Sequence, residues 1–216
     1  MKKLIKSMNV NFLVLFVVSM ALIIPSFSGF VTSFQPSVSF EDLLDGREIK
    51  IGSHISGDVV YAVDYFAAER TYQKTKAGAI IVNKKAGNYY IIPAAKGFLG
   101  LKTAKNQNMD FDKLTDETYT FLKGGQKPQS KIYIDGDIVP MKQELVSSFH
   151  NYLSDAGYTQ EEILNMGAPL LIRPRSFLMN RIFFVSGLIF LYLSFSVLWY
   201  YYRRSSFLEE FSRDMS

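Results

Sequence analysis

The chain has 216 residues, no cysteine and a formal net charge of +4 at pH 7. Without cysteine it forms no disulfide, no thiolate nucleophile and no cysteine-containing zinc site. Residues 34–176 contain 17 lysines and arginines and 17 aspartates and glutamates, so the entire positive excess lies outside them. A nucleic-acid-binding domain needs a basic face on its folded part, and we therefore expect no nucleic-acid partner.

Two uncharged apolar runs, at residues 12–31 and 182–202, are the strongest pattern in the sequence. About 20 helical residues, each rising 1.5 Å, cross a hydrocarbon core roughly 30 Å thick. The lipid bilayer is thus an expected partner, and the residues between the runs suffice for one domain with its own core. The predicted segments are a cytoplasmic N-terminus (1–9), a transmembrane helix (10–33), an extracytoplasmic domain (34–176), a second transmembrane helix (177–202) and a cytoplasmic tail (203–216).

The flanking charges predict the orientation of both spans. Three lysines precede the first run (Lys2, Lys3 and Lys6), and no cation follows it before Arg47. The second run ends in four aromatic residues and two arginines (199–204), which is typical of a cytoplasmic exit. Three arginines on its other flank oppose this assignment (Arg173, Arg175 and Arg181). Because the first span usually dominates, we expect a protein of the cytoplasmic membrane with both termini inside.

The first run also has features of a cleaved signal peptide. Pro25 precedes the pattern Ser26-Phe27-Ser28, which is compatible with a cleavage site. The apolar stretch nevertheless spans about 20 residues, whereas a signal core has about 7–15. We therefore favour a retained anchor, in which Pro25 kinks a membrane helix.

The first half of the domain predicts one short helix and a β meander. Ser39 and Asp42 match a capping box for a helical turn that Gly46 ends. The spacing of Ile49, Ile51 and Ile55 suggests a strand. Further strands are expected at 77–82, 89–93 and 98–103, separated by turns at 84–88 and 95–97.

The second half predicts helices that cover the sheet. A short helix is expected at 112–122, a loop at 124–128 and a strand at 131–139. Pro140 opens the strongest helix, whose apolar stripe runs from Met141 to Ala156. Thr159 and Glu162 match a capping box for a helix that ends at Asn165. Residues 170–172 are either a final strand or the approach to the second span.

The predicted fold class is therefore α+β, with a small bent antiparallel sheet and one or two covering helices. The spacing of Ile49, Ile51 and Ile55 recurs at Ile132, Ile134 and Ile138, each time with a glycine nearby. Two strongly bent strands of a small barrel would produce this repeat. Two ordinary strands with β-branched faces also explain it, and we favour this simpler interpretation.

The histidines and most acidic residues do not match a known site motif. His54 is predicted on the strand face opposite Ile55, and His150 beside the apolar stripe of the long helix. Neither has a second histidine at motif spacing. Three aspartates are spaced like calcium ligands (Asp110, Asp112 and Asp116), but the glycine and the final glutamate of a calcium loop are missing. A solvated acidic loop is the better interpretation.

Two further pairs of aspartates lie close together in the sequence and are candidates for a cation site or for acid–base catalysis. Asp135 and Asp137 flank a glycine and are expected in a turn. Asp58 and Asp64 flank an apolar run and could do acid–base work only if the fold brings them together. The sequence contains no phosphate-binding glycine loop, nucleophile elbow or zinc-protease helix. We therefore expect no catalytic residue, no cofactor and no metal site.

Small residues and tyrosines each allow two interpretations. Ser19 and Ser26 lie seven residues apart, as do Gly187 and Ser194, and such stripes let membrane helices approach closely. Scattered small residues are equally compatible with this spacing. A group of tyrosines has the composition of a binding surface, although we favour ordinary strands for it (Tyr61, Tyr65, Tyr72, Tyr89 and Tyr90).

The domain contains, in order, Gly52-Ser-His-Ile-Ser-Gly-Asp-Val59, Asp64-Tyr-Phe-Ala67, Tyr89-Tyr-Ile-Ile-Pro93, Ile134-Asp-Gly-Asp-Ile138 and Tyr152-Leu-Ser-Asp-Ala-Gly-Tyr-Thr159. Followed by the second span, this order resembles a family of uncharacterised bacterial membrane proteins common among Gram-positive Firmicutes. The resemblance covers most of the chain and implies a two-span architecture. It implies no catalytic motif and no assigned activity.

Three functional hypotheses follow from these patterns. The leading one is a non-enzymatic extracytoplasmic interaction domain that binds a protein partner, or a second copy of the chain, within a membrane complex. The second is a ligand sensor that couples the outer domain to a cytoplasmic partner through the short tail at 205–216. The third is a hydrolase that uses carboxylates such as Asp58 or Asp64.

Overall fold

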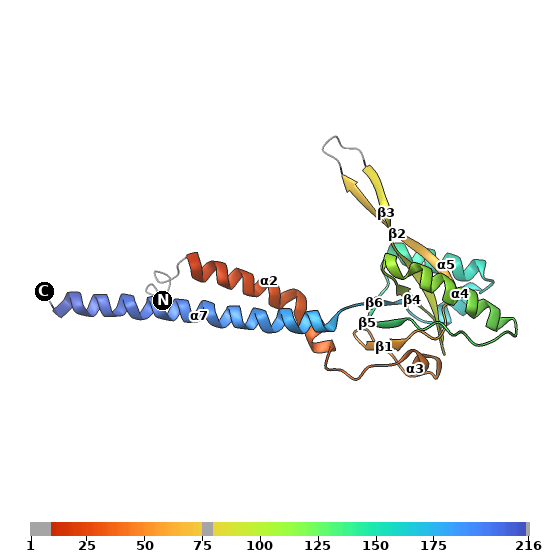
Figure 1. Cartoon of the computed structure of the whole chain (residues 1–216), viewed down its shortest axis with the longest axis horizontal. Coiled ribbons are helices and arrows are strands. Elements are labelled where there is room, and N and C mark those ends of the chain that lie inside the picture. The colour runs from red at the N-terminus through yellow and green to blue at the C-terminus, as the bar shows by residue number, and fades with distance from the viewer. Residues whose placement is uncertain (1–9, 75–79, 215–216) are drawn as a thin grey trace. The chain divides into compact units, whose positions relative to one another are not determined.

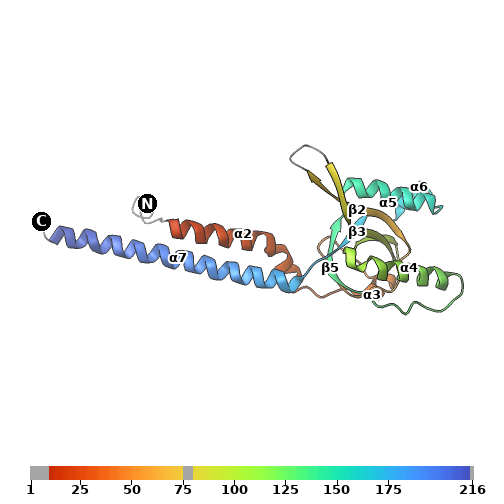
Figure 2. The ribbon, with the colours of Figure 1, turned by 45° about the horizontal axis from the view of Figure 1, so that its top comes forward.

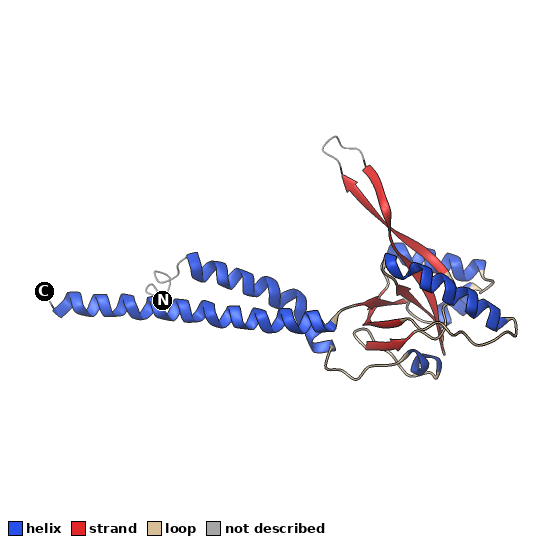
Figure 3. Cartoon of the chain, viewed as in Figure 1, coloured by secondary structure: helices blue, strands red, loops and turns tan. Residues whose placement is uncertain are grey.

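The computed structural model describes residues 10–74 and 80–214, which form two compact units. One unit comprises Met1–Phe34 and Phe177–Ser216, and we call it the helix pair. The other comprises Gln35–Ser176, and we call it the sheet unit. Helices and strands are both present in quantity, as Figure 3 shows, and the α+β class is confirmed.

The helix pair consists of α2 (Val10–Thr32) and α7 (Phe177–Asp214). Both helices are long and apolar enough to cross a membrane, judged by length and composition. Three ring contacts join them: Phe30 with Phe184 at 4.1 Å between centroids, Phe27 with Phe184 at 6.0 Å, and Phe12 with Phe195 at 6.3 Å. The first predicted span is therefore packed against the second along much of its length.

Small residues bring α2 and α7 together. Ser19, Ser26, Gly187 and Ser194 are all buried, which supports close approach of the helices over a scattered distribution. A β-carbon at Gly187 would overlap Ile23, because the backbone of α2 passes directly beside it. The hydroxyls of Ser19, Ser26 and Ser194 donate to carbonyls of their own helices, so these polar groups are satisfied without water.

The sheet unit contains six strands in the order β1-β5-β6-β4-β3-β2 (Figure 1). Their bounds in that order are His54–Asp58, Tyr133–Pro140, Leu170–Pro174, Gly97–Lys102, Ile80–Ala94 and Tyr65–Lys74. Every neighbouring pair is antiparallel except β4 and β6, which are parallel. The sheet is therefore mixed, with four antiparallel pairs and one parallel pair, and β1 and β2 remain as two edges, so it is not closed into a barrel.

Helices cover both faces of the sheet (Figure 2). α3 (Phe40–Leu44) and α4 (Asn108–Leu122) pack on one face, and α5 (Gln143–Asp155) and α6 (Gln160–Asn165) on the other. Strand β3 shows why, because its residues 89–92 are all buried: Tyr90 and Ile92 enter one core, and Tyr89 and Ile91 the other. A strand without an exposed face reads as a continuous apolar run.

The predicted capping boxes are confirmed. The amide of Asp42 donates to the Ser39 hydroxyl at 3.0 Å, and the Ser39 amide donates back to the Asp42 carboxylate at 3.0 Å. Thr159 and Glu162 make the same reciprocal pair at the start of α6. The predicted helices at 112–122 and after Pro140 are present as α4 and α5. Residues 170–172 form part of a strand, β6.

Two predictions for the first half of the domain are wrong, and one strand was missed. Ile51 is 66% exposed and precedes β1, which starts only at His54. The predicted turn at 84–88 lies inside β3, and residues 77–79 of the predicted strand at 77–82 lie outside the described residues. Gly87 misled this prediction, because it is required for close approach of the Thr103 carbonyl and not for a turn. Strand β2, whose sequence mixes charged and small residues, was not predicted.

Only part of the isoleucine repeat lies in strands: Ile55 is in β1 and Ile134 and Ile138 are in β5, whereas Ile49, Ile51 and Ile132 precede these strands. β1 and β5 pair antiparallel, with Ile55 opposite Gly136 and Gly57 opposite Ile134. Each glycine thus faces an isoleucine of the other strand. The favoured interpretation, two strands with β-branched faces, agrees with this arrangement.

Candidate functional site

One end of the sheet carries an ion cluster formed by His54, Asp135, Asp137, Arg173 and Arg175. The buried Asp137 carboxylate accepts from Arg173 Nε at 3.0 Å and Nη2 at 2.6 Å, and from Arg175 Nη1 at 3.3 Å. His54 Nε2 lies 2.6 Å from Asp135 Oδ1. The fold therefore brings together both aspartates of the Asp135-Gly136-Asp137 segment and one of the two predicted histidines.

The ion cluster joins the two segments through which the sheet unit continues into the helices. On the incoming side, His54 Nδ1 lies 3.4 Å from the Gln35 carbonyl, and the Val38 amide donates to the His54 carbonyl at 2.8 Å. On the outgoing side, the Arg175 amide donates to the Asp135 carbonyl at 2.9 Å. The cluster thus holds both connecting segments against this end of the sheet.

The expected turn at Asp135-Gly136-Asp137 is wrong, because these residues lie inside β5. Gly136 is needed there because a β-carbon would overlap the Arg173 carbonyl of the neighbouring strand. The two strands can therefore approach closely enough for Asp137 to accept from Arg173. Sequence spacing alone gave no sign of these arginine partners, which lie 36 and 38 residues away.

The remaining predicted site residues are dispersed. His150 is half-buried on α5, with its ring 6.2 Å from that of Phe149. The three calcium-spaced aspartates lie on α4, so the expected acidic loop is wrong. Asp112 instead accepts a 2.6 Å hydrogen bond from the buried Tyr90 hydroxyl and helps hold α4 on the sheet. Within residues 10–74 and 80–214, no group of three or more His, Asp or Glu is placed to hold a metal ion.

Asp58 and Asp64 lie in different surroundings. Asp58 is exposed at the end of β1 and lines a cavity of about 450 Å³ together with Glu41 and Lys131. Asp64 is exposed and accepts a 2.7 Å hydrogen bond from the Tyr65 amide. The carboxylates of the predicted pair therefore have separate partners.

An aromatic groove lies at the other end of the sheet, at the turn between β3 and β4. Its volume is about 460 Å³, and its walls come from α4, α5, the β3–β4 hairpin and the segment before β2 (Tyr61, Val63, Ile91, Pro93, Phe98, Phe121, Leu122, Tyr152 and Tyr158 among them). Tyr61 and Phe121 stack with centroids 5.6 Å apart. Phe98 and Tyr158 meet edge to face at 5.5 Å. The groove therefore has rigid aromatic walls.

Polar groups are few in the aromatic groove. Burial raises the pKa of the Tyr152 phenol, and the nearby Asp64 carboxylate raises it further, so this group stays protonated and can donate. The buried Thr118 hydroxyl already donates to Leu114 and accepts from the Ala62 amide. A mostly apolar cavity with a few hydroxyls is typical of a binding site.

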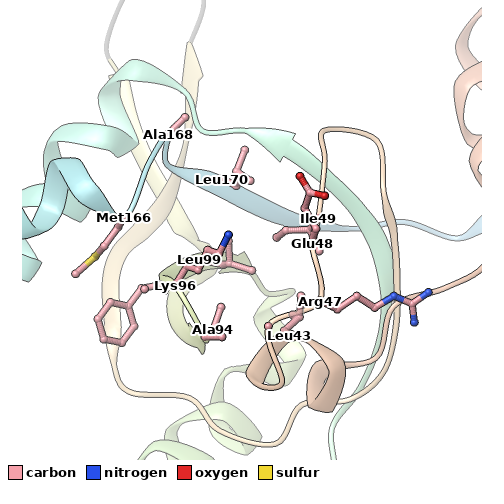
Figure 4. Close-up of a pocket in the computed structure, with 14 residues that line it drawn as sticks. Leu43, Arg47, Glu48, Ile49, Ala94, Lys96, Leu99, Met166, Ala168 and Leu170 are labelled. Carbon is pink, nitrogen blue, oxygen red and sulfur yellow. The ribbon is translucent and has the colours of Figure 1, made fainter.

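A second, smaller cavity lies where β4 and β6 separate, and we call it the fork cavity (Figure 4). It has a volume of about 320 Å³ and shares Phe98 with the aromatic groove. Leu43, Leu99 and Leu170 contribute apolar walls. Lys96, Glu48 and Arg47 also line the cavity, and in Figure 4 the Arg47 guanidinium points away from the other lining residues. Arg47 is paired with Asp42 at 3.1 Å.

The tyrosine prediction is only partly correct. Tyr65 and Tyr72 lie in β2 and Tyr89 and Tyr90 in β3, as expected for ordinary strands. Tyr61 lies outside the strands and lines the aromatic groove. Phe98 was predicted in a strand and Phe121 and Tyr152 in helices, because no local pattern shows that α4 and α5 flank one opening.

Comparison with known proteins identifies the family to which the chain belongs. Searches of curated proteins and of solved structures find no significant match. A family model described as Domain of unknown function (DUF8577) matches residues 1–201, which include the first helix, the sheet unit and most of the second helix. Because the match covers nearly the whole chain, the protein belongs to this family of uncharacterised domains.

Proposed function

We propose that the protein is a membrane-anchored interaction module, in which α2 and α7 cross the cytoplasmic membrane and the sheet unit binds a partner protein outside it. The aromatic groove is the observation that carries this proposal. The sheet unit acts by binding, without catalysis, within a membrane complex. Both termini are cytoplasmic, as the lysines before the first span favour.

The helix pair supports a retained first span. Ser26 and Phe27, at the alternative cleavage site, lie inside α2, where Ser26 is buried and Phe27 contacts Phe184 of α7. Arg181 of α7 donates from Nε to the Ser33 hydroxyl at 2.8 Å and also binds the Ser33 carbonyl, which caps the end of α2. A helix with such specific partners favours an anchor over a removed signal.

Within the sheet unit, the groove and the connections to the helices lie at different ends of the sheet. β4 and β6 run parallel, so Phe98 and Leu170 mark one end of the sheet and Pro174 marks the other. The connections to both helices leave near the Pro174 end, beside the ion cluster. The groove therefore lies at the end of the sheet opposite these connections, and a partner that offers an apolar segment fits it.

Exposed apolar side chains at the groove rim give the partner its contact surface. Leu122 is 70% exposed and Phe121 is 37% exposed at the end of α4. Aromatic side chains are enriched at the centres of protein–protein interfaces, where they act as anchors. The occupant that fits is a short stretch with aliphatic or aromatic side chains on a second membrane-associated protein.

A topology map tests the membrane part of the proposal. Reporters fused after Ser176 and after Ser216 should be extracytoplasmic and cytoplasmic, respectively. A control fusion after Phe34 should match the result after Ser176. A cytoplasmic reporter after Ser176 would invert the orientation and contradict the proposed location.

Site-specific photocrosslinking tests the groove. A photoreactive residue at Leu122 should crosslink to one partner, and the same residue at Met109, which is 84% exposed at the other end of α4, should not. The purified partner should bind the full chain in detergent, and Leu122→Asp should weaken that binding about tenfold. Equal crosslinking at both positions, or undiminished binding to Leu122→Asp, would refute the groove. An adduct with a second copy of the chain would identify the partner as a homo-oligomer.

A second candidate function, ligand sensing, is favoured by the ion cluster. Because the cluster ties the incoming and outgoing segments to the same two residues of β5, a change in the sheet unit would reach both helix connections together. A cytoplasmic partner would then detect the change through residues 205–216. Deleting those residues should abolish the output while the protein remains in the membrane, and an unchanged output would remove this candidate.

A further inference from the structure

The fork cavity has an open strand edge that the aromatic groove lacks. The ladder between β4 and β6 consists of Gly100 with Leu171 and Leu101 with Ile172. Before these pairs the two strands separate, and the cavity lies between them. Among the residues that the structure describes, residues 97 and 98 of β4 pair with β3, but their other edge, toward β6, has no strand partner. An extended backbone inserted here would continue the ladder along β4.

The wall opposite β4 is a segment without helix or strand. Residues 46–49 connect α3 to the turn before β1 and line the cavity. The Ala95 amide donates to the Leu43 carbonyl at 2.9 Å, which fixes the β3–β4 turn against the end of α3. The cavity is therefore held on two sides by backbone, with apolar side chains of Leu43, Leu99 and Leu170 between them.

Two residues of opposite charge line the fork cavity. Lys96 is at the turn between β3 and β4, and Glu48 is on the facing segment; both are exposed cavity residues. Figure 4 shows both side chains among the residues that line the cavity. A ligand that carries a carboxylate and an ammonium would match this pair, because each of its charged groups would meet the opposite sign.

The size of the fork cavity limits the ligand. A volume of about 320 Å³ lies at the small end of the range for small-ligand sites, roughly 300–1,000 Å³. We propose that the fork cavity binds a short zwitterionic peptide of two or three residues with aliphatic side chains, extended along β4. Its carboxylate is bound by Lys96 and its ammonium by Glu48. This inference does not depend on the aromatic groove or on the partner proposed for it.

Titration of peptides tests the inference on the full chain in detergent. The probe is the dipeptide Leu-Leu, followed by isothermal titration calorimetry and by nuclear magnetic resonance of labelled leucines. Saturable binding is expected, and acetylation and amidation of the dipeptide should each weaken it about three- to tenfold, since each removes one charged contact. Absence of binding to a folded protein at millimolar dipeptide would overturn the proposal.

Charge variants show whether the fork cavity is the site. Lys96→Gln and Glu48→Gln should each weaken Leu-Leu binding about three- to tenfold, whereas Lys105→Gln, an exposed lysine outside the cavity, should not. Amidated dipeptide should lose sensitivity to Lys96→Gln, because its carboxylate is already absent. Binding that Lys96→Gln and Glu48→Gln leave unchanged would place the peptide elsewhere and refute the site. Leu122→Asp should leave dipeptide binding intact even where it abolishes binding of a protein partner.

Discussion

The two ends of the sheet differ in how their side chains are satisfied. At the Pro174 end, Arg173 and Arg175 bind the Asp137 carboxylate, His54 contacts Asp135, and the cluster fixes the connections to both helices. At the Phe98 end, aromatic and aliphatic side chains line two cavities, and Leu122 remains 70% exposed. Side chains at the Pro174 end bind other residues of the same chain, whereas side chains at the Phe98 end remain accessible to a ligand or partner.

This difference separates stability from recognition. The buried Asp137 carboxylate is bound by two arginines. Removing one member of such a cluster destabilises the fold, because it leaves an uncompensated charge. An aromatic groove contributes less to folding, since part of its surface remains in water. Substitutions should therefore act on stability at the Pro174 end and on binding at the Phe98 end.

The largest expected effect is at Asp137. Asp137→Ala should lower the free energy of unfolding by about 2–4 kcal/mol, because the side chain is buried and its loss leaves Arg173 and Arg175 without their shared carboxylate. Chemical denaturation of the full chain in detergent measures this. The control is Glu69→Ala, which removes a half-exposed pair with Lys102 and should cost less than about 1 kcal/mol. Equal losses for the two variants would contradict the distinct role of the ion cluster.

The next largest effect concerns the helix pair. Gly187→Leu should separate α2 from α7 and cost about 1–3 kcal/mol, because the new side chain overlaps Ile23. The cysteine-free chain allows a direct measurement, in which a short bifunctional thiol reagent joins Phe27→Cys to Phe184→Cys and the crosslinking yield reports helix contact. Leu188→Ala, a neighbouring exposed position, is the control and should leave the yield unchanged. An undiminished yield in Gly187→Leu would argue against this helix contact.

A smaller effect is expected in the aromatic groove. Phe121→Ala removes the stack on Tyr61 and should cost about 0.5–1.5 kcal/mol of stability. Its effect on partner binding should be larger, because Phe121 is 37% exposed and lies at the rim. Denaturation and partner titration on the same preparation measure both quantities. A large stability loss without any change in binding would show that the groove is part of the core.

The smallest effect is a local pH dependence at Glu117. Hydrogen bonds from the Ser130 and Gln129 amides and the Ser130 hydroxyl hold the pKa of this carboxyl below its ordinary value of 4.5. The stabilisation is therefore present above pH 4.5 and is lost as the pH falls through the lower pKa of the folded state. Amide hydrogen exchange at Gln129 and Ser130 should accelerate there, and Glu117→Gln should remove the pH dependence. Exchange that stays constant across this range would contradict the role of Glu117.

The elements that the sequence predicts well are those set by local chemistry. Ser39 with Asp42 and Thr159 with Glu162 each satisfy helix donors within four residues, so their capping boxes are visible without any tertiary information. The two long apolar helices are equally local, because length and composition define them. The α+β class follows from such elements together.

The sites were less predictable because they depend on distant contacts. Asp137 meets Arg173 only because the strands β5 and β6 are neighbours, and Phe121 meets Tyr61 only because α4 crosses the segment before β2. Glycine signals were ambiguous for the same reason. Gly87 and Gly136 mark close approach of another strand or loop, whereas Gly46, with φ of 88°, does end a helix.

The parallel placement of β6 also determines when the sheet can be completed. β6 lies between β5 and β4, yet it is the last strand along the chain. Until it is synthesised, the other strands form two separate groups, β1 with β5 and β4 with β3 and β2. Strand pairings between residues distant in the sequence form slowly, and the strand edges stay exposed until they form. The strand that completes the sheet is therefore also the one that leads directly into α7, which starts three residues after it.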